Sequence, residues 1–376
     1  MTAWVLFAVG AVASALGLLT VFKAPEWIDW RLVVFVGQYC YVAALVPLIS
    51  GVIAYNLPGG HGDVAAIAAR VSCAVGFALL FQPCIQAWVM GRRLPAQLER
   101  QFGPTGMTGP AFSFAGLFRA APRAAPRSTW TYSGTLQLDL FPAIGRSPAP
   151  CVIVIHGGGW DDGDRDQIPQ FNNWLARSGY AVAAISYRLA PGATWPAQRD
   201  DVLAAIASVK EHASEWGVDP SRLVILGRSA GGQIAEASAY AFNDPAIRGV
   251  VALYAPADMK FAYKFSREDD VIKSPSLMRN FLGGTPEESG ANYDSASSIL
   301  LVGPGTPPTL QIHGTIDTLV WHKQSERLAA RLSEAGIPNL LVSMPWATHA
   351  LEFNLSGPSG QLSLFAVKGF LAGVCR

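Results

Sequence analysis

The chain has 376 residues and a formal net charge of +1, and charged residues make up only 15% of it. This balance excludes the strong field that a nucleic-acid-binding surface needs, so we expect no nucleic-acid partner. The cysteines are odd in number, with no CxxC spacing, which argues against a disulfide framework or a zinc site; they are Cys40, Cys73, Cys84, Cys151 and Cys375.

The first 91 residues are strongly apolar and contain only six charged residues. Three uncharged stretches, residues 3–22, 32–55 and 71–90, are each long enough to cross a bilayer as a helix, which takes roughly 20 residues. Tryptophans and tyrosines near their ends are typical of the membrane interface. We therefore predict a three-helix transmembrane region over residues 1–91. The alternative is one signal anchor followed by buried core helices.

The basic residues near these stretches predict an orientation. Lys23 and Arg31 follow the first stretch, and Arg92, Arg93 and Arg100 follow the third. An odd number of spans places both basic regions on one side, and basic flanks favour the cytoplasm. We therefore expect an integral protein of a bacterial inner membrane, with the C-terminal domain in the cytoplasm.

A linker is expected over residues 92–128, which are rich in glycine, proline, alanine and arginine. Within it, the apolar stretch Ala111–Phe118 is followed by three arginines. Apolar residues beside basic ones suit a membrane surface with anionic headgroups. A plain tether explains the composition equally well, and both interpretations stay open.

From residue 129 onward, short β-branched runs alternate with segments of helical periodicity. The expected strands are Thr131–Leu140 (a strand or hairpin), Cys151–Ile155, Ala181–Ser186, Leu223–Leu226, Val250–Tyr254, Thr309–Ile312 and Leu340–Met344. The expected helices are Asp200–Trp216, Gln233–Ala241, Ser325–Ala335 and Leu362–Ala372. This alternation predicts an α/β domain over residues 129–376, a mostly parallel sheet with helices on both faces. Residues 260–305 interrupt it and are expected to form an insertion over the carboxyl edge of the sheet, where such folds keep their sites.

The stretch Gly227-Arg228-Ser229-Ala230-Gly231 fits the G-x-S-x-G pattern between an expected strand and an expected helix. That context is what a nucleophile elbow requires, because the serine must sit at the tip of a strained turn. A serine hydroxyl also needs a base. His349, just after the last expected strand, is the best-placed histidine. We predict Ser229 as nucleophile and His349 as base.

The third member should be an acid that orients the base. Asp317 follows an expected strand and gives the chain order Ser, Asp, His of the α/β-hydrolases. Asp258 and Asp294 are rival candidates. We predict Asp317.

A glycine-rich loop, His156-Gly157-Gly158-Gly159-Trp160, follows an expected central strand. Backbone amides there could face the negative charge that develops on a carbonyl oxygen. We predict an oxyanion hole from the amides of Gly157, Gly158 and Ala230, with His156 as a structural residue. A phosphate site is disfavoured, because the chain has neither a G-x-G-x-x-G pattern nor a Walker lysine.

Five features together resemble the hormone-sensitive-lipase-like carboxylesterase branch of the α/β-hydrolases: HGGGW at 156–160, YRLAP at 187–191, GRSAGG at 227–232, Asp317 and His349. The resemblance covers roughly residues 129–376. It implies hydrolysis of small-molecule or lipid esters through an acyl-serine, with no cofactor. Arg228 departs from it, because many members carry an acidic residue there, and apolar spans stand where many relatives have a cap. The alternatives are a peptidase or amidase of the same fold, or a catalytically silent membrane scaffold.

Overall fold

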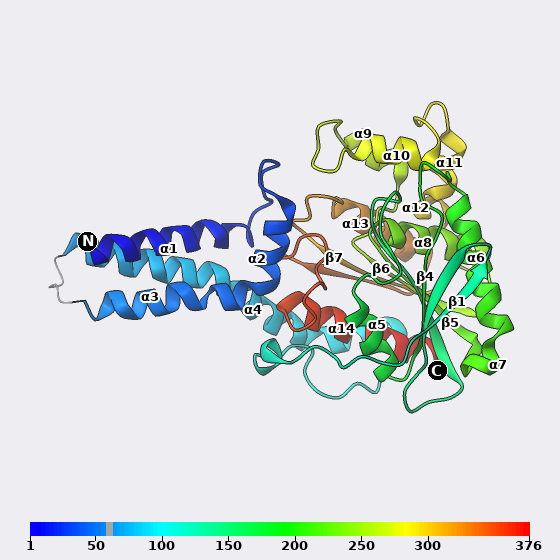
Figure 1. The fold of residues 1–376 in the computed structure, drawn as a ribbon, viewed down its shortest axis with the longest axis horizontal. Helices are drawn as coiled ribbons and strands as arrows, with labels where there is room; N and C mark the ends of the chain where they lie inside the picture. The colour runs from blue at the N-terminus through cyan, green and yellow to red at the C-terminus, as the bar shows by residue number, and fades with distance from the viewer. Residues whose placement is uncertain (58–62) are drawn as a thin grey trace.

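The computed structural model describes residues 1–57 and 63–376, which form a helical bundle projecting from an α/β domain (Figure 1). The bundle contains four helices: α1 (Thr2–Leu18), α2 (Trp30–Ala43), α3 (Leu45–Tyr55) and α4 (Val64–Phe102). The N-terminus lies at the end of the bundle that is distant from the α/β domain, whereas α2 lies at the junction between the two parts (Figure 1).

The α/β domain is built on one eight-stranded sheet in the order β1-β2-β4-β3-β5-β6-β7-β8. The strands are β1 (Ser128–Ser133), β2 (Leu136–Phe141), β3 (Ala149–Ile155), β4 (Ala181–Ile185), β5 (Val218–Arg228), β6 (Ile247–Leu253), β7 (Thr309–Gly314) and β8 (Asn339–Met344). The β1–β2 hairpin runs antiparallel at one edge, and β2 is antiparallel to β4. All other neighbours are parallel, which confirms the predicted mostly parallel sheet.

Helices cover both faces of the sheet, as predicted. Side chains alternate along each strand, so Ile153 and Ile155 of β3 pack on one face and Val152 and Val154 on the other. The first face is covered by α6 (Ala197–Glu211), α8 (Ala230–Phe242) and α13 (Lys323–Glu334). The second is covered by α5 (Pro169–Arg177), α14 (Pro358–Val374) and the end of α4. The expected helix Asp200–Trp216 is instead two helices, α6 and α7 (Ala213–Trp216), with His212 between them.

Between β6 and β7 the chain forms four short helices in place of a regular crossover. They are α9 (Met259–Phe265), α10 (Ser274–Leu282), α11 (Gly290–Ala296) and α12 (Ser298–Leu301). Phe281 of α10 stacks on Trp160, which follows β3, with ring centroids 4.6 Å apart. This contact holds the insertion against the glycine-rich loop.

The three predicted spans match the bundle only in part. The stretch 3–22 is helical only to Leu18, and the stretch 32–55 is two helices bent by 43°. Pro47 lies in the first turn of α3 and has no N–H to continue the hydrogen bonds of α2. The stretch 71–90 lies inside a longer helix, α4. Among the described residues, α4 alone is a single helix long and apolar enough to cross a membrane, and the bent α2–α3 pair passes the same test if it counts as one span.

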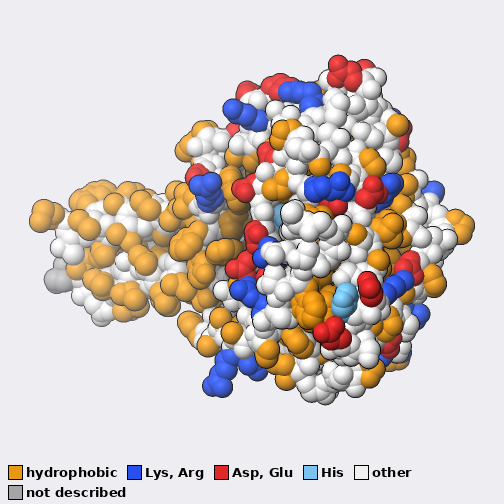
Figure 2. All heavy atoms as spheres, turned by 45° about the vertical axis from the view of Figure 1, so that its right-hand side comes forward, with side chains coloured by type: hydrophobic (Ala, Val, Ile, Leu, Met, Phe, Trp, Pro, Cys, Tyr) orange, Lys and Arg blue, Asp and Glu red, His pale blue; other side chains and the backbone are white. Residues whose placement is uncertain are grey.

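The bundle packs through small residues and exposes large apolar ones. A Cβ on Gly10 of α1 would lie 2.3 Å from Ser72 Oγ of α4, and a Cβ on Gly76 would lie 2.8 Å from Ala13 Cβ, so these glycines permit the close α1–α4 contact. Apolar side chains cover much of the face of the bundle that Figure 2 shows. The exposed apolar residues of the bundle include Trp4, Val12, Phe35, Ile49, Val52, Val64, Val71 and Trp88, each more than 40% exposed.

Residues 92–128 do not form a free tether, and one continuous helix crosses the predicted boundary at residue 91. Helix α4 continues to Phe102, whose ring meets Phe370 of α14 edge to face at 4.7 Å. Phe112 and Leu117 are also buried, in the same cluster as the second face of the sheet. The apolar residues of the linker therefore pack largely against the protein.

Candidate active site

Ser229 occupies a strained turn between β5 and α8. Its backbone angles are φ 51° and ψ −120°. Residues other than glycine rarely adopt this conformation, which costs on the order of 1–3 kcal/mol. Its amide donates to the Leu253 carbonyl oxygen on the neighbouring strand at 2.8 Å, and its carbonyl accepts from Gly232 and Gln233 of α8. The turn is therefore fixed from both sides.

The glycines that flank Ser229 are required by the close approach of backbone. A Cβ on Gly227 would lie 2.0 Å from the Gly231 carbonyl oxygen, and a Cβ on Gly231 would lie 2.2 Å from the His156 carbonyl oxygen. Both distances are far below van der Waals contact. Any side chain at either position would push the elbow or the glycine-rich loop out of place.

The structure brings His349 and Asp317 together. His349 Nδ1 lies 2.8 Å from Asp317 Oδ2, and Asp317 is fully buried. The other carboxylate oxygen accepts from the amides of Leu319 and Val320 at 2.8 and 3.0 Å. Since an ionised carboxylate only accepts hydrogen bonds, Nδ1 carries a hydrogen, and in the neutral ring the lone pair is then on Nε2.

His313 is a second histidine at this carboxylate, and we did not predict it. Its Nε2 lies 3.3 Å from Asp317 Oδ2. Burial alone would raise the pKa of Asp317, but the charges and hydrogen bonds of His349 and His313 outweigh it and hold that pKa below its usual range. The i,i+4 spacing of His313 and Asp317 at the end of a strand was the available signal.

The rival acids are engaged elsewhere. Asp258 accepts from the Phe261 amide at 2.9 Å, as the cap of α9, and pairs with Arg327 at 2.6 Å. Asp294 pairs with Lys260 at 2.6 Å.

His61, another of the histidines in the chain, lies outside the described residues.

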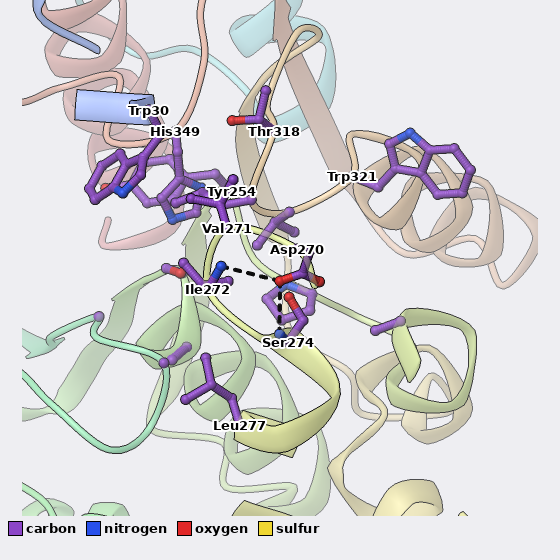
Figure 3. A pocket seen from close by; sticks show the side chains of 18 of the residues that line it. Trp30, Tyr254, Asp270, Val271, Ile272, Ser274, Leu277, Thr318, Trp321 and His349 are labelled. Atoms are coloured by element: carbon purple, nitrogen blue, oxygen red, sulfur yellow. Dashed lines mark hydrogen bonds between the residues drawn. The ribbon is translucent and has the colours of Figure 1, made fainter. Parts of the chain in front are cut away.

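Ser229 and His349 line the same cavity, of about 900 Å³. Trp30, Tyr254 and His349 lie on one side of it, and the segment from Asp270 to Leu277 lies on another (Figure 3). Within the described residues the serine hydroxyl and the imidazole do not form a hydrogen bond. Such bonds are often long in free enzymes and tighten when substrate binds.

The predicted oxyanion hole needs one correction. The Gly157 amide donates to Gln167 Oε1 at 2.9 Å, so it is already occupied and the prediction for it is wrong. The amides of Gly158, Gly159 and Ala230 donate no hydrogen bond to any group in the part of the chain that the structure describes, and all three residues line the cavity. Gly158 and Gly159 have φ of 126° and 60°, which turns this backbone through angles that glycine tolerates.

His156 has the structural setting that the sequence suggested. Its Nδ1 donates to the Gly157 carbonyl oxygen at 2.8 Å, and its ring stacks on Tyr187 with centroids 4.2 Å apart. Burial lowers the pKa of His156, which favours the neutral ring. A neutral imidazole in this position holds the glycine-rich loop in shape.

Arg228, the residue that departs from the family pattern, forms a buried ion pair. Its Nε lies 2.7 Å from Glu352 Oε1, and the two side chains are 1% and 0% exposed. The same oxygen accepts from the Tyr254 hydroxyl at 2.8 Å, and the Tyr254 ring packs on His349 with centroids 4.4 Å apart. The guanidinium also lies over the Phe171 ring at 4.8 Å. The pair thus joins the residue before the nucleophile to the segment after His349.

A second buried acid lies on the nucleophile's helix. Glu236 is fully buried, its Oε2 accepts from Ser298 Oγ at 2.9 Å, and burial raises its pKa to about 8 from 4.5. A carboxyl whose pKa is raised on folding stabilises the folded protein fully at pH values below its unfolded-state pKa, here 4.5. This stabilisation is lost as the pH rises through the folded-state pKa, here about 8. We expect the free energy of unfolding to fall by on the order of 4 kcal/mol more in wild type than in Glu236→Gln between about pH 4 and about pH 8.

Chemical denaturation of both proteins across that range checks this expectation. The exposed Glu334→Gln on α13 is the matched control and should follow wild type. Equal slopes in wild type and Glu236→Gln would contradict it.

No group of three or more His, Cys, Asp or Glu side chains suited to a metal ion occurs in residues 1–57 and 63–376.

The comparison with known families bears on the same segment. The BD-FAE family matches residues 138–332, more than half of the chain. The chain belongs to the BD-FAE family. The match includes the glycine-rich loop, the elbow and Asp317, and it ends before His349.

Curated relatives of this BD-FAE chain are esterases by name. The probable carboxylic ester hydrolase LipM of Mycobacterium tuberculosis is 31% identical over 236 residues, covering 60% of this chain and 54% of LipM. Esterase LipQ of the same organism is 30% identical over 213 residues, covering 54% and 51%. The chain spans about half the length of these relatives.

Solved structures show the fold of this BD-FAE chain. A bacterial heroin esterase superposes with a TM-score of 0.59 at 20% identity, covering 78% of this chain and 98% of that one. A truncated carbohydrate esterase from gut microbiota gives 0.56 at 24% identity, covering 66% and 99%. The α/β domain therefore has the α/β-hydrolase fold.

Proposed function

We propose that this protein hydrolyses carboxylic esters, with Ser229 as nucleophile, His349 as base and Asp317 as the acid that orients it. One observation carries the proposal: a buried Asp317–His349 pair opens onto the cavity that also contains a serine in a strained turn. The esterase names of the relatives support the same reaction.

The geometry suggests how the reaction would proceed. Ser229 Oγ attacks the ester carbonyl while His349 Nε2 takes its proton, and Asp317 stabilises the imidazolium through Nδ1. The amides of Gly158, Gly159 and Ala230 would hold the negative oxygen, where one donor contributes about 3 kcal/mol. The imidazolium then protonates the leaving alcohol, and the acyl group stays on the serine. Water activated by the same histidine releases the acid and restores the hydroxyl.

We further propose that the bundle anchors the enzyme in a membrane and that its esters are apolar. The exposed apolar surface of the bundle supports the first part, because monomeric soluble proteins rarely expose so large a patch. Leu277, Met278 and Phe261 of the insertion line the cavity and support the second. Orientation follows from the basic flanks, which favour a cytoplasmic α/β domain. A reporter fused after Arg376 and assayed from both sides of the membrane tests it.

The function is tested with the purified full chain in detergent. We expect hydrolysis of p-nitrophenyl esters from acetyl to palmitoyl, and covalent labelling by a fluorophosphonate probe at Ser229. Higher rates on amides than on esters would contradict esterase activity, and so would a lack of labelling at Ser229.

Leu277 is expected to set acyl preference. Its Cδ1 lies 3.1 Å from where a Cβ on Gly159 would be, so it sits directly over the glycine-rich loop. Leu277→Trp would fill that part of the cavity and should lower the ratio of kcat/KM for octanoyl over acetyl esters by about tenfold, since a few methylenes contribute that much discrimination. Leu300→Trp, at a 59% exposed position of α12, is the control. An unchanged ratio in Leu277→Trp would show that acyl chains bind elsewhere.

A further inference from the structure

Helix α2 differs from the rest of the bundle in its contacts. It lies at the junction with the α/β domain (Figure 1). Its residues Cys40 and Tyr41 belong to the same buried cluster as the second face of the sheet. Gln38, one turn earlier, is only 3% exposed. An amide buried in this way needs hydrogen-bond partners, because an unpaired polar group that is removed from water destabilises the fold.

In residues 1–57 and 63–376, the side-chain hydrogen bonds of Gln38 go to residues just after His349. Gln38 Nε2 donates to the Leu351 carbonyl oxygen at 2.8 Å, and its Oε1 accepts from the Asn354 amide at 3.2 Å. The Gln38 carbonyl accepts from Asn354 Nδ2 at 3.1 Å, and the same side chain donates to Tyr41 Oη at 3.4 Å. Gln38 and Tyr41 of α2 thus form hydrogen bonds with one short segment, residues 351–354.

The other side of that segment is bound to the nucleophile's strand. Glu352 points inward to Arg228, the residue before Ser229. Between His349 and this segment lies Ala350, with φ of 53°, a positive angle that fixes a sharp turn. The histidine therefore stands at the end of a segment that α2 holds on one side and the elbow holds on the other.

The start of α2 reaches the site directly. Trp30 lines the cavity, on the same side as His349 and Tyr254 (Figure 3). Helix α2 lies outside residues 138–332, the part shared with the BD-FAE family. Family membership therefore assigns no role to it.

We propose that α2 positions His349, through the hydrogen bonds of Gln38 to residues 351–354, so that the bundle is a part of the active site as well as an anchor. The inference rests on the proposed function, because it assigns His349 as the base. Gln38 and Asn354 are positioning residues and touch no reacting atom.

The experiment compares wild type with Gln38→Ala, Asn354→Ala and the double variant, all as full chains in detergent. Active sites are counted by fluorophosphonate titration, so kcat on p-nitrophenyl acetate is expressed per reactive serine. We expect kcat per site to fall about tenfold in each single variant while KM changes by less than about twofold, since small misplacements of a base mainly slow the chemistry. The two substitutions remove different hydrogen bonds between α2 and the same segment, so the double variant should be slower than either single variant.

Gln82→Ala is the matched control, and the rate of fluorophosphonate inactivation is the second readout. Gln82 donates to the Thr20 carbonyl oxygen at 3.1 Å inside the bundle, so its loss removes a comparable hydrogen bond away from His349. It should leave kcat per site unchanged. The inactivation rate needs no ester and should fall with kcat in the Gln38 and Asn354 variants.

Two results would overturn the inference alone. One is wild-type kcat per site and wild-type inactivation rate in both single variants. The other is a loss of total activity that the fraction of reactive serine fully accounts for, because that is a folding defect. A wild-type protein that neither hydrolyses esters nor reacts with the probe would instead overturn the proposed function, and the inference with it.

Discussion

Ser229→Ala is expected to lower kcat on p-nitrophenyl acetate by about a millionfold, the scale seen when a serine nucleophile is removed from an intact triad. Alanine cannot form the acyl intermediate, and His349 then has no hydroxyl to deprotonate. KM should change little, because the cavity walls and the oxyanion amides remain in place. Initial rates and fluorophosphonate labelling of the purified variant measure both effects.

Ser238→Ala is the matched control for that result. Ser238 lies on the same helix, α8, and is fully buried. Its loss changes a hydroxyl in the same element without touching the cavity, so activity should stay near wild type. Residual activity above about one per cent in Ser229→Ala, in a preparation free of contaminating esterase, would assign the nucleophile to another residue.

Glu352→Leu is expected to lower the free energy of unfolding by about 3–5 kcal/mol. The reason is that Arg228 would keep its charge at 1% exposure, with no carboxylate beside it. Tyr254 would also lose the acceptor of its hydroxyl. Chemical denaturation of the full chain in detergent measures the loss.

The double variant Arg228→Met with Glu352→Leu separates charge burial from packing. Replacing both members of a buried pair by apolar residues is often neutral or stabilising, so we expect most of the lost stability to return. Activity should not return with it, because the link between the elbow and the His349 segment stays broken. If the free energy of unfolding of Glu352→Leu lies within about 1 kcal/mol of the wild-type value, water must reach the Arg228–Glu352 pair.

The α/β domain could be predicted because its signals are local. Most of its parallel strands are buried on both faces and read as short apolar runs. The predicted runs overlap every strand of the sheet, although β5 begins at Val218, ahead of the predicted Leu223. Ser229, Asp317 and His349 follow three of these strands, and parallel strands bring their carboxyl ends to one edge. The structure joins two of the three by a hydrogen bond, and the role of each stays a prediction.

The parts that could not be predicted depend on contacts between distant segments. Occupation of the Gly157 amide depends on Gln167 reaching back across a loop, and the counter-ion of Arg228 lies 124 positions further along the chain. Helix α5 spans only nine residues, which is shorter than the window over which helical periodicity is read. The bend at α2–α3 was missed because hydropathy measures apolar length and carries no information on direction.

Helix α4 runs for 39 residues without a break, about 60 Å at 1.5 Å per residue. Its first part lies in the apolar bundle, and its last turns pack on α14 in the core of the α/β-hydrolase domain. Because one continuous helix belongs to both parts, a change in the tilt of the bundle also changes the orientation of the α/β domain. Transmembrane helices lean more in thinner bilayers, so in the proposed membrane setting the angle at which the cavity meets the headgroups follows from the thickness of the lipid layer.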